Sequence, residues 1–161
     1  MANAINRFAV LTIVCFCLLG CTSKVELDPL VNPVVEIEGK PNQKIYVTYD
    51  RINGKVVNGE FFGDSSNNPG TRLLDEQGQL KLTFEQETHG LNVRIVNLDS
   101  NSLRAVAKAD NAKEDKGEVA DKLECIHLML GFQFDKSTGG SFYRSPESWI
   151  ESAVKEASNF E

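Results

Sequence analysis

The sequence predicts an α+β protein in which an antiparallel β-sandwich is followed by one or two C-terminal helices. Three observations carry this prediction. Residues 34–108 form short segments in which apolar and polar residues alternate, with turn-forming residues between them. After Lys108 the chain becomes rich in charge and poor in large apolar side chains. Finally, an apolar stripe with helical spacing runs from Trp149 to Ala157.

The first part of the chain predicts strands that each have one apolar face. The alternating apolar residues are Val35 and Ile37; Ile45, Val47 and Tyr49; Leu80, Leu82 and Phe84; and Leu91, Val93 and Ile95. Asn53-Gly54 is typical of a tight hairpin turn, so we expect it to join a strand that ends near Ile52 to a strand over residues 55–62. Residues 63–70 are rich in Gly, Asp, Ser and Asn, which predicts a loop.

One segment of this part resembles a known family. Residues 71–84, with Asp75-Glu-Gln-Gly78 at their centre, resemble a hairpin of transthyretin-like and carboxypeptidase-regulatory-like β-sandwiches. The resemblance implies a sandwich of the transthyretin-like or immunoglobulin-like kind, and it implies nothing about a ligand.

The C-terminal part predicts two helices. Val119, Leu123, Ile126 and Leu130 fall at helical spacing, and Gly131 suits the left-handed residue just past a helix end. We therefore expect a helix over about 118–130 and a short strand over 132–134. Residues 126–134 also alternate, so a strand is the competing interpretation. A final helix is expected to be capped by Ser145, to begin at Pro146 and to bury its stripe in a core.

The N-terminus resembles the signal peptide of bacterial lipoproteins. Arg7 precedes an apolar run over residues 8–19, which is shorter than a membrane span, and Leu18-Leu-Gly20-Cys21 resembles the lipobox. The resemblance implies that Cys21 receives a diacylglyceryl thioether, that cleavage follows Gly20, and that the new amino group is acylated, for example with palmitate. It also implies an outer-membrane address facing the periplasm or the cell surface, because Thr22 stands where an aspartate would retain a lipoprotein in the inner membrane.

These observations predict residues 1–20 as a signal peptide, 21–32 as a lipidated tether and 33–161 as one globular domain. Residues 33–108 would form its sandwich, and residues 109–161 its helical or mixed part. Removing Arg7 with the signal leaves 16 basic and 23 acidic residues, a formal charge of −7, which argues against nucleic-acid binding. Cys15 and Cys17 leave with the signal and Cys21 carries lipid. Cys125 is therefore expected to be a free thiol, and no internal disulfide is expected.

The sequence offers few residues for chemistry. Cys125 and His127 are a possible nucleophile and base, but on a helix two residues that are two apart do not face each other, so a buried, inert cysteine is favoured. No metal-ligand spacing or phosphate-binding loop is present, and no cofactor is expected.

Recognition residues are instead expected in polar loops held by the scaffold. The candidates are the acidic Glu114, Asp115 and Glu118, and the aromatic Phe142 and Tyr143. We therefore expect a lipid-anchored cell-envelope protein that binds a protein partner and has no catalytic activity. The alternative is a small envelope hydrolase that uses Cys125 or a carboxylate site.

Overall fold

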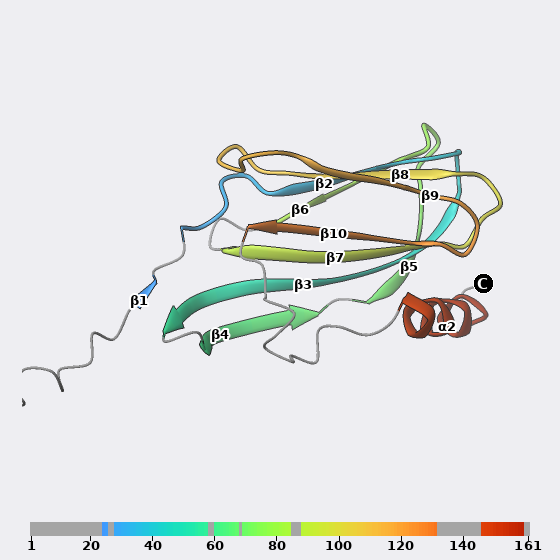
Figure 1. Cartoon of the computed structure of the whole chain (residues 1–161). Helices are drawn as coiled ribbons and strands as arrows, with labels where there is room; N and C mark the ends of the chain where they lie inside the picture. The colour runs from blue at the N-terminus through green and yellow to red at the C-terminus, as the bar shows by residue number, and fades with distance from the viewer. Residues whose placement is uncertain are drawn as a thin grey trace, which may run out of the picture.

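The computed structural model describes residues 24–25, 28–57, 60–67, 69–84, 88–131 and 146–159, and shows two antiparallel sheets stacked face to face with one helix beside them (Figure 1). Sheet A contains β1 (Lys24–Val25), β3 (Lys44–Val57), β4 (Glu60–Asn67), β5 (Gly70–Leu73), β7 (Gly90–Asn97) and β10 (Cys125–Gly131). Sheet B contains β6 (Gln79–Thr83), β2 (Val34–Glu38), β8 (Leu103–Lys108) and β9 (Lys116–Ala120), in that spatial order. The helix is α2 (Pro146–Ala157). The α+β, sandwich-like fold expected from the sequence is therefore confirmed.

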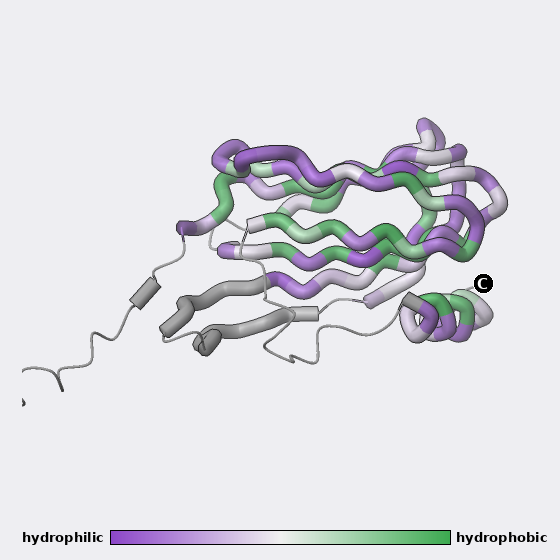
Figure 2. Tube along the Cα trace, viewed as in Figure 1, coloured by the Kyte–Doolittle hydropathy of each residue, from purple (hydrophilic) through white to green (hydrophobic). Residues whose placement is uncertain are grey.

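The core lies between the two sheets, because successive side chains of a strand point to opposite faces. Sheet B contributes residues such as Val35 and Ile37, and sheet A contributes residues such as Ile45, Val93 and Ile126. Each of these five side chains is no more than 1% exposed. Green and purple alternate along most of β7 in Figure 2, which reflects the same period of two.

The expected hairpin at Asn53-Gly54 is wrong. Both residues lie within β3, where Asn53 is opposite Asp64 and Gly54 is opposite Gly63 on β4. The ladder closes with Val57 opposite Glu60, so the two residues between the strands are a second Asn-Gly pair at 58–59.

The loop expected over residues 63–70 is also wrong for residues 63–67 and 70, which belong to β4 and β5.

The helix expected over 118–130 is wrong as well, and the competing strand interpretation holds. β9 and β10 are strands, and β10 pairs with β7 from Cys125 opposite Val96 to Gly131 opposite Gly90. Gly131 has the positive φ of 75° that was expected of it, but at the end of a strand. A side chain there would place its Cβ 2.5 Å from the His89 carbonyl oxygen, so the close approach requires glycine. The strand expected over 132–134 lies outside the described residues.

The C-terminal helix is confirmed as α2, which begins at the expected Pro146. Ala153 is completely buried against Tyr46 and Val96, with Trp149 and Ile150 packed beside it. Val154, which was expected in the buried stripe, is 47% exposed. No helix in the described part of the chain is both long and apolar enough to cross a bilayer.

The described end of the expected tether lies against the sandwich. The Leu30 amide donates to the Thr88 carbonyl at 2.7 Å, and the Val31 amide donates to Asn111 Oδ1 at 2.9 Å. Asn111 in turn donates from Nδ2 to the Pro29 carbonyl. These bonds fasten residues 29–31 to the end of the domain where the loop between β8 and β9 turns.

Candidate functional site

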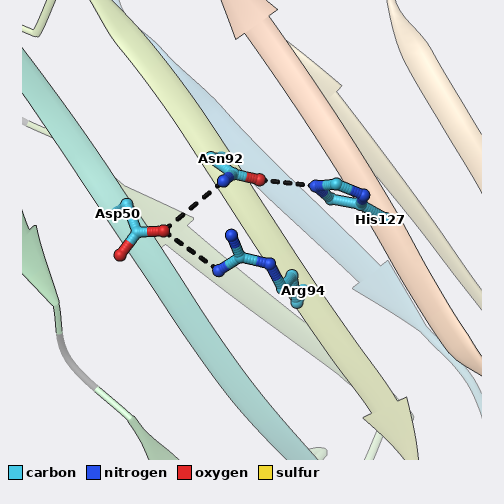
Figure 3. A network of polar contacts seen from close by, with 4 residues as sticks. All are labelled: Asp50, Asn92, Arg94 and His127. Atoms are coloured by element: carbon cyan, nitrogen blue, oxygen red, sulfur yellow. Dashed lines mark hydrogen bonds and ion pairs between the residues drawn. The ribbon is translucent and has the colours of Figure 1, made fainter. Parts of the chain in front are cut away.

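Four polar side chains form a connected cluster on the outer face of sheet A, the face turned away from the core (Figure 3). Asp50 comes from β3, Asn92 and Arg94 come from β7, and His127 comes from β10. His127 is directly opposite Arg94 across the β7–β10 ladder. Hereafter these four residues are called the polar cluster.

The polar cluster is held by hydrogen bonds and one ion pair. Arg94 Nη1 lies 3.0 Å from Asp50 Oδ2, and the same oxygen accepts a longer bond of 3.4 Å from Asn92 Nδ2. Asn92 Oδ1 lies 2.6 Å from His127 Nε2. The side chains of Arg94 and Asp50 are only 2% and 8% exposed, so both charges lie away from bulk water. A buried charge is stable only when it is paired and hydrogen-bonded, which this arrangement achieves.

Helix α2 covers one end of this face. The Trp149 ring lies against the Arg94 guanidinium, 4.3 Å from ring centroid to Cζ, which is a cation–π contact. Close by, burial raises the pKa of the Tyr46 hydroxyl, and the negative charge of Glu156 on α2 raises it further. The polar cluster therefore joins three strands to the helix.

Cys125 lies on the same face as His127, because residues two apart on a strand point the same way. Its thiol is half-buried, and desolvation raises its pKa, a rise that the Glu118 charge reinforces and the Arg94 charge opposes. A nucleophilic cysteine needs the opposite, a lowered pKa that supplies thiolate at neutral pH. His127 Nε2 lies within hydrogen-bond distance of Asn92 Oδ1, and Cys125 Sγ donates to the Ile126 carbonyl. These contacts give Cys125 the environment of a structural cysteine.

A cleft of about 390 Å³ opens at the end of the sandwich where residues 28–30 enter the domain. Its apolar lining includes Leu30, Met129 and Leu130, and its charged lining includes Lys113 and Glu114. Lys116 Nζ is paired with the Glu114 carboxylate, and this hydrogen bond lowers the pKa of Glu114. The loop between β8 and β9 thus forms one wall of the cleft and the end of β10 forms another.

The structure separates the acidic residues that were expected to bind a partner. Glu114 lines the cleft, and Asp115 is exposed next to it. Glu118 instead turns to β10, where Oε2 accepts the His127 backbone N–H at 3.0 Å. Gly20, Cys21, Phe142 and Tyr143 lie outside the described residues.

Sequence reasoning missed the buried pair of Asp50 and Arg94. The available signal was Gly90–Asn97 itself, a strand in which Asn92 and Arg94 alternate with apolar residues, but such a pattern is equally typical of a strand with one face in water.

No group of three His, Cys, Asp or Glu residues among the described residues is arranged to hold a metal ion. Comparison of the chain with known proteins gave no relative: no family model, no curated protein and no solved structure matches it.

Proposed function

We propose that the protein is a lipid-anchored binding protein of the bacterial cell envelope, without catalytic activity, that holds a protein partner at the cleft beside the β8–β9 loop. The observation that carries the proposal is the cleft, which combines an apolar floor of Leu30, Met129 and Leu130 with a charged rim. Concave sites that combine apolar side chains with placed polar groups are where ligands usually bind.

The charge of the rim indicates the kind of partner. Residues 110–118 contain four carboxylates, at Asp110, Glu114, Asp115 and Glu118, and two lysines. Asp110, Glu114 and Glu118 bind groups of the domain itself, so the exposed Asp115 presents unpaired negative charge to solvent beside the Glu114–Lys116 ion pair. Such a rim favours a partner with a basic surface, because complementary charge accelerates association.

Anchoring is proposed from the lipobox-like residues that end at Cys21, and the outer-membrane address, facing the periplasm or the cell surface, is proposed from Thr22. The non-catalytic part of the proposal is supported by the environment of Cys125. Its raised pKa keeps the thiol protonated at neutral pH, which disfavours the alternative of a hydrolase with a cysteine nucleophile.

Site-specific photo-crosslinking in cells tests the binding proposal. A photoreactive amino acid replaces Lys113 at the cleft, and a matched control replaces Arg104, whose side chain is 59% exposed on the outer face of sheet B. We expect a cross-linked partner from position 113 and none from position 104. The double variant Glu114→Lys/Asp115→Lys should weaken that product. Glu118 is left unchanged because it binds the β10 backbone. The same product from both positions, or none from position 113, would contradict the proposal.

A further inference from the structure

Strand β6 is an open edge of the sandwich. It ends the order β6-β2-β8-β9 and, among the strands that the structure describes, pairs with β2 alone (Figure 1). At such an edge the outward backbone N–H and C=O groups are available to another strand.

The hydrogen-bond pattern identifies which backbone groups of β6 point outward. The Gly39 amide donates to the Gly78 carbonyl, and the Phe84 amide donates to the Pro33 carbonyl. Because the bonding direction alternates along an antiparallel ladder, Leu80 and Leu82 also bond to β2, while Gln79, Lys81 and Thr83 point outward.

Only some of these outward backbone groups are already hydrogen-bonded within the chain. Asp75 occupies both outward groups of Gln79: its Oδ1 accepts the Gln79 amide at 2.7 Å, and its amide donates to the Gln79 carbonyl. No hydrogen bond within the described part of the chain uses the outward N–H and C=O of Lys81 and Thr83. Two donors and two acceptors therefore remain free, spaced as in a strand.

The side chains of β6 leave this edge unprotected. Leu80, Leu82 and Phe84 point toward the core but stay half-buried, so an added strand would cover them. An inward-pointing charge would block such pairing, but Lys81 points to the outer face, where Glu36 lies 3.8 Å away. At the opposite side of the sandwich, by contrast, the Glu118 carboxylate occupies the outward His127 amide of edge strand β10.

We propose that β6 pairs antiparallel with β6 of a second copy of this chain, about a two-fold axis at Leu82. In this register Lys81 of one copy is opposite Thr83 of the other, and all four free backbone groups of each copy are bonded. Leu82 is opposite Leu82, and Leu80 is opposite Phe84, so the half-buried apolar row continues from one sandwich into the next. The two four-stranded sheets B become one sheet of eight strands. This is an isologous interface, as a two-fold dimer requires.

Charge disfavours the alternative register in which the two-fold axis lies at Lys81. Centring the axis on Lys81 would place two lysines directly opposite each other, which is unfavourable, and would direct the second copy to Gln79, whose groups Asp75 occupies. With the axis at Leu82, each lysine is opposite a neutral threonine.

Cysteine cross-linking tests the register, using the lipidated full chain in detergent micelles with Cys125→Ala as background. One preparation carries Lys81→Cys and another carries Thr83→Cys. Residues in a hydrogen-bonded antiparallel pair have Cα atoms about 5.5 Å apart, within disulfide range, whereas diagonal neighbours at about 7–8 Å are too far. We expect a disulfide-linked dimer when the two preparations are mixed, and none from either alone or from the background. A cross-link from Lys81→Cys alone, or none from the mixture, would overturn the proposal.

A second pair of variants tests the backbone bonds by sedimentation. Thr83→Pro removes one outward donor from each copy, a change that edge strands tolerate, whereas Thr83→Val keeps the donor. We expect Thr83→Pro to raise the dimer dissociation constant roughly 30-fold or more, as the loss of two hydrogen bonds of ordinary net strength implies. Thr83→Val should change it little, and both variants should melt like the parent. A parent protein that sediments only as a monomer, or a Thr83→Pro variant that dimerises as well as the parent, would contradict the pairing.

Discussion

At the scale of the residue, the buried ion pair of Arg94 and Asp50 has large consequences. Both side chains are almost completely removed from water, so neither charge can be left alone without a large penalty. Arg94 also lies against Trp149, so the same guanidinium connects the sheet to α2. The pairing of the two charges therefore stabilises them in their buried position, and the Arg94 guanidinium fixes the position of the helix.

Asp50→Ala should lower the free energy of unfolding by roughly 3–5 kcal/mol, because it leaves the Arg94 charge buried without its carboxylate. Asp50→Leu combined with Arg94→Met should cost less than the single change, since it removes both charges and restores apolar volume. Urea denaturation of the three proteins measures both effects. A single variant as stable as the parent would show that water reaches Arg94.

A second ion pair, on the outer face of sheet B, predicts a pH dependence. Lys108 Nζ lies 2.6 Å from Glu36 Oε2, and this hydrogen bond is the main reason that the pKa of Glu36 falls below its ordinary value of 4.5. A carboxyl whose folded-state pKa is lowered stabilises the fold above the unfolded-state pKa, and this contribution is lost as the pH falls through the folded-state pKa.

Lys108→Met should therefore lower the melting temperature most near neutral pH, and the difference from the parent should shrink as the pH falls below about 4.5. Both side chains are more than one-third exposed, so salt should reduce the effect. Melting curves of both proteins over a pH series measure the difference. A difference that is constant over the acidic range would mean that the methionine acts through packing.

At the scale of the element, α2 forms a separate apolar contact from the one between the sheets. Ala153 packs with Tyr46 and Val96, whereas the core between the sheets has no member from α2. The helix should therefore be able to leave the sheet without unfolding the sandwich.

Ala153→Asp should detach α2, because it buries an unpaired carboxylate in a site with no room for it. Trp149, the chain's only tryptophan, lies on this helix, so its fluorescence should shift to longer wavelength. The circular dichroism of the strands should be retained. A fluorescence shift accompanied by loss of the strand circular dichroism would show that helix and sandwich form one cooperative unit.

The elements α2 and β10 also show how much of the fold could be predicted from the sequence. α2 was predictable because Pro146 and an apolar stripe support the same structure. β10 was not, because Ile126, Leu128 and Leu130 satisfy both a helical and an alternating pattern in part. That error carried over to the site, since only a strand places Cys125 and His127 on one face.

The two Asn-Gly pairs were locally equivalent, and only the β3–β4 register distinguishes them. The burial of the polar cluster could not be predicted either, because α2, whose Trp149 covers Arg94, comes from a distant part of the chain. The cleft likewise depends on residues 28–30, 111–116 and 129–131, which are brought together only by the fold.

At the scale of the whole molecule, the proposed anchor is tested by Cys21→Ser. A thioether requires the cysteine sulfur, so the variant should accumulate as uncleaved precursor and should take up no labelled palmitate. Metabolic labelling and electrophoretic mobility measure both outcomes, with Cys125→Ser as the control that should behave like the parent. Continued labelling of Cys21→Ser would rule out lipid on this residue.

The pairing of β1 with the far end of β3 determines how high such an anchored domain could stand above a bilayer. Lys24 is opposite Val57, and only two residues separate Cys21 from Lys24. Three extended residue steps cover about 10 Å, only slightly more than one polar headgroup layer, which is about 5–8 Å thick. As long as β1 stays paired, a lipid on Cys21 would hold the tip of the β3–β4 hairpin close to the headgroups. The cleft opens at the same end of the sandwich, so a partner would have to reach it from the side, between the domain and the membrane.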